Sequence, residues 1–258
     1  MLARYLGRLN IVSRFAFASL ACIIGYLAAC DQQASLIGDR STTDSPIDAT
    51  RSVVETETAP VIVAFGDSLT AGLGVASPQT YPAQLQNKIS QAGFSHRVVN
   101  MGVNGETTAG ALRRLDHIME LRPSIVILEF GANDGLRGLA VDQTQANLAQ
   151  IIGRLRARDI MVVLTGMRLP PNYGPSYTRS FAQIFPTLAT MYHIPFMPFF
   201  LQDVATKPAL NQPDGLHPTA TGYSIIVDNL WPILFPILKP GGDSTAILGE
   251  SRTKWDEQ

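Results

Sequence analysis

The chain has only two cysteines, Cys22 and Cys30, and no cysteine–histidine cluster at the spacing that a structural zinc ion requires. We therefore expect no structural zinc site. The sequence also has no long run of lysine or arginine, and its formal net charge is only −1. Because proteins that bind nucleic acids carry strongly basic patches, we expect no nucleic-acid partner.

The N-terminus has the layout of a secretory signal. The first 29 residues carry Arg4, Arg8 and Arg14 and no acidic residue, and an apolar run extends over Phe15–Ala29. A positive start followed by an apolar segment that ends in small residues is typical of a signal peptide. The run is shorter than the roughly 20 apolar residues that a spanning helix needs, so we interpret residues 1–29 as a signal peptide and not as a permanent transmembrane anchor.

The end of this run, Leu27-Ala28-Ala29-Cys30, resembles a bacterial lipobox. In a lipobox the cysteine becomes the lipidated first residue of the mature protein, which would make this chain an exported, periplasmic lipoprotein anchored to a membrane through Cys30. The alternative is an ordinary signal peptide cleaved near Ala29, which leaves Cys30 unmodified. Either cleavage removes Cys22, so we expect no internal disulfide in the mature chain.

Composition divides the remainder into three parts. Residues 30–58 are rich in serine, threonine, aspartate and glutamine, and such a segment buries too little apolar surface to offset the entropy of ordering it. We interpret them as a flexible tether, and residues 241–258 as a disordered tail. The predicted folded domain is therefore 59–240, an ordinary size for one domain.

Apolar runs alternate with helical patterns inside this domain. The predicted strands are Val61–Phe65, Arg97–Met101, Ser124–Phe130, Ile160–Thr165 and a weaker one around Pro195–Phe199. The predicted helices are Tyr81–Ala92, Thr107–Glu120, Gln143–Ala157, Ser176–Tyr192 and Thr219–Leu234. Continuous apolar strands imply a sheet covered on both faces. The alternation predicts an α/β fold with a parallel sheet of about five strands, in which ligands bind at the carboxyl ends of the strands.

Four loops at these ends carry residues suited to catalysis. They are Gly66-Asp67-Ser68-Leu69, the loop around Gly102, Gly131-Ala132-Asn133-Asp134 and Asp214-Gly215-Leu216-His217. A serine hydroxyl is a weak nucleophile until a base removes its proton, and His217 is the predicted base for Ser68. Asp214, three residues earlier, is placed to fix the imidazole tautomer and stabilise the imidazolium.

A tetrahedral intermediate also needs hydrogen-bond donors for its oxyanion. We predict that the backbone N–H groups of Ser68 and Gly102 and the side-chain amide of Asn133 supply them. Gly102 has no Cβ, so a substrate can approach its N–H closely. Taken singly, each residue also has a structural interpretation: Ser68 as a helix N-cap, Gly102 and Asn133 as turn residues, and Asp67 as a tie for its own loop.

Together and in this order, the four loops resemble the conserved blocks of the GDSL/SGNH hydrolase family over nearly all of residues 59–240. The segments Arg168–Gly174 and Gly131–Gly138 are similar to its bacterial acyl-thioesterase, lysophospholipase and arylesterase branch. The resemblance implies a flavodoxin-like three-layer α/β/α fold and ester hydrolysis through an acyl-enzyme on Ser68, with no metal or organic cofactor. It also implies that Leu169, Pro170 and Tyr173 contact the acyl chain.

The sequence departs from two patterns. Ala132 stands where this branch often has glycine, which narrows the space beside the predicted oxyanion hole. Thr70 lies two residues after Ser68, so the Gly-x-Ser-x-Gly nucleophile elbow of α/β-hydrolases is absent.

The predicted function is hydrolysis of small acyl esters or lysophospholipids by a monomer. One alternative is a carbohydrate or peptidoglycan O-acetyl esterase, which would need an open polar cleft, whereas the Leu169–Tyr173 loop favours acyl chains. A second alternative is a non-enzymatic binding lipoprotein, which predicts a damaged triad, whereas Ser68, Asp214 and His217 are all present. A third is a protease, but nothing in the sequence specifies a peptide groove.

Overall fold

The computed structural model describes residues 59–239, and a sheet of five parallel strands runs through them. The strands lie in the order β2-β1-β3-β4-β5, which confirms the predicted parallel sheet. Their bounds are β1 Val61–Gly66, β2 Arg97–Gly102, β3 Ile125–Glu129, β4 Met161–Thr165 and β5 Phe196–Met197. The predicted signal peptide, tether and tail, with Cys30, lie outside the described residues.

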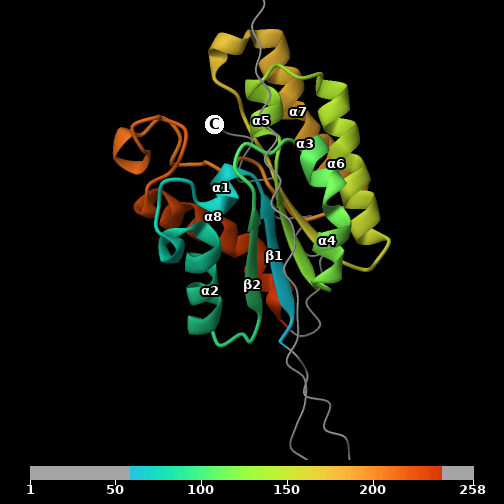
Figure 1. Cartoon of the computed structure of the whole chain (residues 1–258), viewed down its shortest axis with the longest axis vertical. Coiled ribbons are helices and arrows are strands. Elements are labelled where there is room, and N and C mark those ends of the chain that lie inside the picture. Colours follow the sequence, from blue (N-terminus) through green and yellow to red (C-terminus); the bar gives the residue numbers. More distant parts are fainter. Residues whose placement is uncertain (1–58, 240–258) are drawn as a thin grey trace, which may run out of the picture. The chain divides into compact units, whose positions relative to one another are not determined.

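Helices cover both faces of the sheet and make three layers (Figure 1). Helices α2 and α8 pack together on one face, and α3, α4, α6 and α7 cover the other. The helices are α1 Ser68–Ala71, α2 Tyr81–Gln91, α3 Thr108–Arg113, α4 Leu115–Glu120, α5 Ala132–Leu136, α6 Val141–Arg156, α7 Pro175–Tyr192 and α8 Ala220–Leu238. Short 3-10 turns occur at Ser77–Gln79, Pro171–Tyr173 and Pro208–Leu210.

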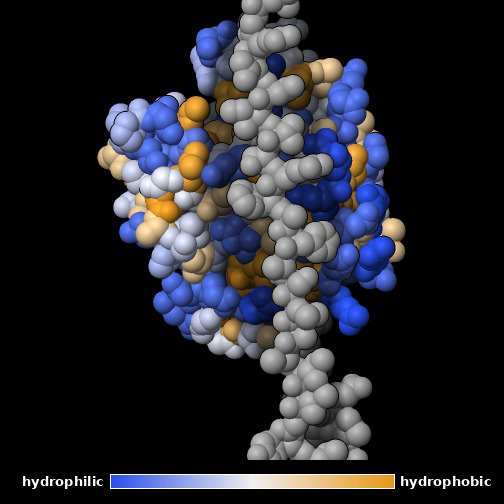
Figure 2. All heavy atoms as spheres, viewed as in Figure 1, coloured by the Kyte–Doolittle hydropathy of each residue, from blue (hydrophilic) through white to orange (hydrophobic). Residues whose placement is uncertain are grey.

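The helices bury one side each, as their sequence patterns predict. In α6 the residues Leu148, Ile151 and Leu155 are buried, whereas Arg154 and Arg156 are exposed. The outer surface over α6 is accordingly mainly hydrophilic (Figure 2). Helix α8 is long and apolar enough to cross a membrane by length and composition alone, but in the described domain it packs against α2 and β5 as a helix of the core.

The strands differ in how far they are buried. Strands β1, β3 and β4 are buried along almost their whole length, as continuous apolar runs predict. Strand β2 is half-buried or exposed throughout, so the expectation that it is covered on both faces is wrong. The reason is its place at the edge of the sheet, where it pairs only with β1.

The predicted helix Thr107–Glu120 is broken at Arg114, which separates α3 from α4. The Arg114 guanidinium turns back to the carboxyl ends of β1 and β2, where it donates to the carbonyls of Gly66 and Met101 at 3.3 and 2.8 Å. Its Nε also donates to Glu106 at 2.7 Å. This side chain therefore ties the loop after β2 to the sheet.

The register brings three strand ends to one level. Gly66 of β1 pairs with Gly102 of β2 on one side and with Glu129 of β3 on the other. The loops that leave these positions carry Ser68 and Asn133. Parallel pairing therefore collects residues from distant parts of the sequence at the edge where ligands bind in such sheets.

Candidate active site

Ser68 begins the short helix α1 just after β1, and the residue is 8% exposed. The N-cap of this helix is Asp67, whose Oδ1 accepts the Leu69 N–H at 3.0 Å. Asp67 thus ties down its own loop as expected, whereas the alternative that Ser68 is the cap is wrong. The cap leaves the Ser68 hydroxyl free to turn toward another segment.

That segment is the turn before α8, which holds His217 and Asp214. His217 Nε2 lies 2.9 Å from Ser68 Oγ, and His217 Nδ1 lies 2.7 Å from Asp214 Oδ2. The other carboxylate oxygen of Asp214 accepts the backbone N–H groups of Leu216 and His217 at 2.9 and 3.0 Å. One carboxylate therefore fixes both the turn and the imidazole ring.

The same contacts set the charge of Asp214. Burial by itself would raise the Asp214 pKa, but the hydrogen bonds from the His217 and Leu216 N–H groups and the nearby imidazole outweigh it and lower the pKa to about 2. Asp214 is therefore a carboxylate throughout the range in which enzymes work. A carboxylate at this position favours the His217 tautomer with hydrogen on Nδ1, which leaves Nε2 as the acceptor for the Ser68 proton.

Asn133 lies in α5, the short helix that follows β3. Its Nδ2 donates to Asp67 Oδ2 at 2.9 Å. A carboxamide nitrogen carries two hydrogens, so this contact fixes the amide while leaving its second hydrogen available. Asp67 thereby joins the loop that carries Ser68 to the loop after β3.

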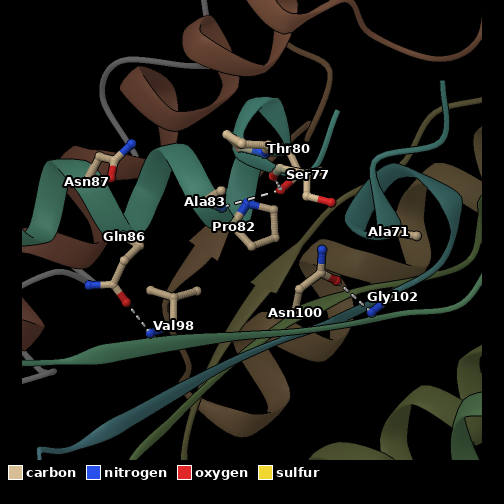
Figure 3. A pocket seen from close by; sticks show the side chains of 11 residues that line it. Ala71, Ser77, Thr80, Pro82, Ala83, Gln86, Asn87, Val98, Asn100 and Gly102 are labelled. Atoms are coloured by element: carbon tan, nitrogen blue, oxygen red, sulfur yellow. Dashed lines mark hydrogen bonds between the residues drawn. The ribbon is translucent and has the colours of Figure 1, made fainter. Parts of the chain in front are cut away.

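Gly102 does not fit its predicted part in the oxyanion hole. It is the last residue of β2, and its N–H donates to Asn100 Oδ1 at 2.9 Å, on the outer edge of the sheet (Figure 3). A Cβ at Gly102 would overlap the backbone N of Ala71, so the absence of a side chain serves the packing of α1 on β2. The Gly102 N–H is therefore already bonded to the side chain of Asn100, two residues earlier in the chain, and is not available to an oxyanion.

We expect Gly102→Ala to lower the free energy of unfolding by about 1–3 kcal/mol, because the added methyl meets backbone that cannot rotate away. Thermal unfolding measures this effect, with Gly153→Ala as the control, since a Cβ there comes no closer than 3.8 Å to Tyr192. A Gly102→Ala protein with unchanged stability and a greatly reduced kcat would return Gly102 to the oxyanion hole.

Comparison with known proteins decides the family. Residues 64–225 match the sequence model of the GDSL-like Lipase/Acylhydrolase family. The chain belongs to this family. Among the described residues, no three histidine, cysteine, aspartate or glutamate side chains group as metal ligands would.

The relatives of this GDSL-like hydrolase are esterases. It is 39% identical to esterase TesA of Pseudomonas aeruginosa over 70% of this chain and 90% of that protein. It is 35% identical to thioesterase 1/protease 1/lysophospholipase L1 of Escherichia coli over 70% of this chain and 86% of that protein. The crystal structure of TesA matches with a TM-score of 0.67 at 39% identity, covering 69% of this chain and 99% of that one. The chain is therefore a serine-dependent ester hydrolase with the flavodoxin-like SGNH fold.

The hydrolase places the predicted acyl-chain residues beside α5. Leu169 is half-buried and would collide with any side chain at Gly135, so part of its surface serves packing. The Tyr173 hydroxyl donates to the carbonyl of Leu136 at 3.0 Å, and Pro170 is exposed. The loop therefore covers the helix that carries Asn133, and its contact with an acyl chain stays a prediction.

Two further residues near the candidate site were not predicted from the sequence. Gly105, in the loop after β2, has a φ of +72°, and its N–H donates to no acceptor among residues 59–239. Glu129 ends β3 with 0% exposure. Each had a signal in the sequence: Gly105 is a glycine between two polar residues, three positions after the end of β2, and Glu129 is a lone charge in the apolar run Ser124–Phe130.

Proposed function

We propose that Ser68 is the nucleophile of this hydrolase, His217 its general base and acid, and Asp214 the residue that orients His217. The observation that carries the proposal is the line of two hydrogen bonds, 2.9 Å from Ser68 to His217 and 2.7 Å from His217 to Asp214. Nucleophile, base and orienting acid within hydrogen-bond reach of each other are the arrangement that activates a serine.

The reaction follows in two halves. Ser68 Oγ bonds to the acyl carbon as its proton passes to His217 Nε2, and the bond to the leaving oxygen or sulfur breaks as His217 returns that proton to it. Water then attacks the acyl-enzyme with His217 again taking a proton, and the carboxylic acid leaves as Ser68 recovers its hydrogen. Asp214 keeps its charge throughout and stabilises the imidazolium.

For the oxyanion we propose the Ser68 N–H, the second amide hydrogen of Asn133 and the Gly105 N–H in place of that of Gly102. The Ser68 N–H is in the first turn of α1, where backbone donors have no acceptor within the helix. Asn133 is held by Asp67, and the Gly105 carbonyl is held by Arg137 at 2.7 Å. Donors fixed before the substrate arrives need no reorganisation during the reaction.

We propose acyl chains, as in aryl esters, lysophospholipids and acyl thioesters, as the substrate class. Of the exposed large apolar residues in the described domain, Met191 lies near the end of α7. The others lie in loops that follow α1, β2 and α5 or precede His217, and they are Leu73, Val103, Leu139 and Leu216, each 40–44% exposed. Leu216 precedes His217, and the Leu73 carbonyl accepts from Gln212 of the same turn at 2.7 Å. An apolar rim at the nucleophile favours an acyl chain over the polar surface that a carbohydrate deacetylase needs.

We further propose export to the periplasm and anchoring through a lipid on Cys30, on the strength of the charged start, the apolar run and the lipobox-like end of residues 1–30. A tether over 30–58 would then let a monomeric domain reach esters in or near the membrane.

The test uses residues 31–258, which contain the whole described domain, and p-nitrophenyl esters from acetate to palmitate. We expect kcat/KM to peak beyond acetate, and a p-nitrophenyl phosphonate ester to add its phosphonyl group to Ser68 alone, located by peptide mass spectrometry. Activity on acetate only would favour the O-acetyl esterase. Folded protein with neither turnover nor phosphonylation would favour the binding lipoprotein.

A further inference from the structure

A second acidic residue lies beneath the nucleophile. Glu129 Oε2 accepts the Thr70 hydroxyl at 2.8 Å and the Asp67 N–H at 3.3 Å. Gly66 makes room for this contact, because a Cβ there would overlap Thr70 Oγ1 and come within 2.5 Å of Glu129 Oε2. Glu129 therefore holds helix α1 through Thr70 and the residue before the helix, Asp67. It makes no hydrogen bond with Ser68, His217 or Asp214 in the described domain.

Its neighbour Asp67 is equally buried, at 0% exposure. Both Asp67 oxygens accept N–H donors, Oδ1 from Leu69 and Oδ2 from Asn133. Accepting two N–H donors favours the charged form of a carboxyl group. Glu129, by contrast, has one buried oxygen, Oε1, with no partner in the described domain.

When two buried carboxyl groups share a site, the charge of one strongly raises the pKa of the other. Burial raises the pKa of Asp67 to about 6, against the pull of its hydrogen bonds from Leu69 and Asn133. Burial, and next the charge of Asp67, raise the pKa of Glu129 well above its ordinary value. The proton of the pair therefore stays on Glu129.

We propose that Glu129, as a neutral carboxylic acid, is a positioning residue for the oxyanion hole. It holds the Asp67 backbone by accepting its N–H, and the Asp67 carboxylate in turn aims the Asn133 amide. The inference rests on the proposed function, in which Asn133 is an oxyanion donor. Glu129 acts through Asp67 and needs no contact with substrate.

Among residues 59–239 no lysine or arginine donates a hydrogen bond to either carboxyl group, and Arg114 donates instead to the Gly66 and Met101 carbonyls and to Glu106. Tyr81 of α2 lies 3.5 Å from Thr70 Oγ1, and burial raises the pKa of Tyr81 and of Tyr223 of α8 above the usual range, so both stay neutral. The nearby His217 favours the charged form of Asp67. Ionising Glu129 would consequently set its charge against that of Asp67 alone.

The decisive variants are Glu129→Gln and Glu129→Ala. Glutamine keeps both contacts, because its side-chain oxygen still accepts the Thr70 hydroxyl and the Asp67 N–H, so kcat should stay within about threefold of the parent. Alanine removes both, and kcat should fall about 10²-fold with little change in KM, as on loss of an oxyanion donor. Thr165→Val is the matched control, because Thr165 is buried at the end of β4 and bonds only the Leu128 carbonyl, at 3.3 Å.

The pH profile separates positioning from mere packing. As pH rises through the raised Glu129 pKa, the parent should lose kcat because two carboxylates then repel and release Asn133. Glu129→Gln has no proton to lose and should keep its kcat at that pH. A raised carboxyl pKa also lowers stability as pH increases from the ordinary carboxyl pKa up to the raised value. The fall in Tm over that pH range should therefore shrink in Glu129→Gln.

A measurement without turnover makes the claim independent of the proposed chemistry. In ¹⁵N-labelled protein, the side-chain NH2 signals of Asn133 are identified by their absence from Asn133→Asp. They should keep their positions in Glu129→Gln and Thr165→Val, and shift or broaden in Glu129→Ala. Unmoved signals in Glu129→Ala, or equal losses of kcat in Glu129→Gln and Glu129→Ala, would overturn the inference. Absence of any ester hydrolysis in the parent would instead defeat the proposed function.

Discussion

Ser68→Ala is expected to lower kcat for ester hydrolysis by about 10⁶-fold, the scale on which serine hydrolases depend on their nucleophile. The variant has no oxygen to form the acyl-enzyme, and His217 then has no proton to take from position 68. What remains is activation of water by His217 beside the oxyanion donors. Initial rates with the best p-nitrophenyl ester measure the loss.

The fold should be unaffected by this change, which makes the result clear. The partner that Ser68 Oγ contacts is His217, and the helix cap belongs to Asp67. Tm should therefore stay near that of the parent, and the exposed Ser77→Ala serves as a control of the same chemistry. A folded Ser68→Ala protein that retains about a tenth of the parent activity or more would show that another residue is the nucleophile.

Asp214→Asn should lower kcat by about 10⁴-fold while leaving the turn intact. The asparagine oxygen still accepts the N–H groups of Leu216 and His217, but its NH2 group then faces His217 Nδ1. That reverses the imidazole tautomer and puts a hydrogen on Nε2, where the Ser68 proton must go. The measurement is kcat for Asp214→Asn and for Asp214→Glu, which keeps a carboxylate and should lose less.

The pH behaviour of the parent supplies a separate check on Asp214. Because its pKa is lowered to about 2, Asp214 stays charged far below neutral pH and sets no acid limb in the activity profile. The stability it contributes is fully present above the unfolded-state pKa of 3.8 and is lost as pH falls through about 2. The parent should thus lose Tm in that window more steeply than Asp214→Asn; equal slopes would contradict the lowered pKa.

The features that could be predicted from the sequence are those whose residues are neighbours in the chain. The strands β1, β3 and β4 could be predicted because each is a continuous apolar run, and Asp214 and His217 because they lie three residues apart in one turn. The edge position of β2 could not, because strand order depends on pairing between distant segments. For the same reason the role of Glu129 could not be predicted, because its hydrogen-bond partners Thr70 and Asp67 lie about sixty residues away in the chain.

Gly102 failed as an oxyanion donor for a local reason. In a strand, successive N–H groups point to opposite sides, and that of Gly102 points away from β1. Sequence spacing identified a glycine at the end of β2 but not the direction of its hydrogen. Gly105, three residues later and past the strand, is free of that constraint.

The carboxamides along β2 have a consequence for the behaviour of the protein in a crowded compartment. An edge strand with unpaired N–H groups is a template on which a second chain adds a strand, and this is a common start of aggregation. Here Gln86 Oε1 takes the Val98 N–H at 2.6 Å and Asn100 Oδ1 takes that of Gly102 at 2.9 Å. Two neutral side chains thus block intermolecular strand pairing along the open margin of the sheet, and they do so without adding charge near the apolar rim.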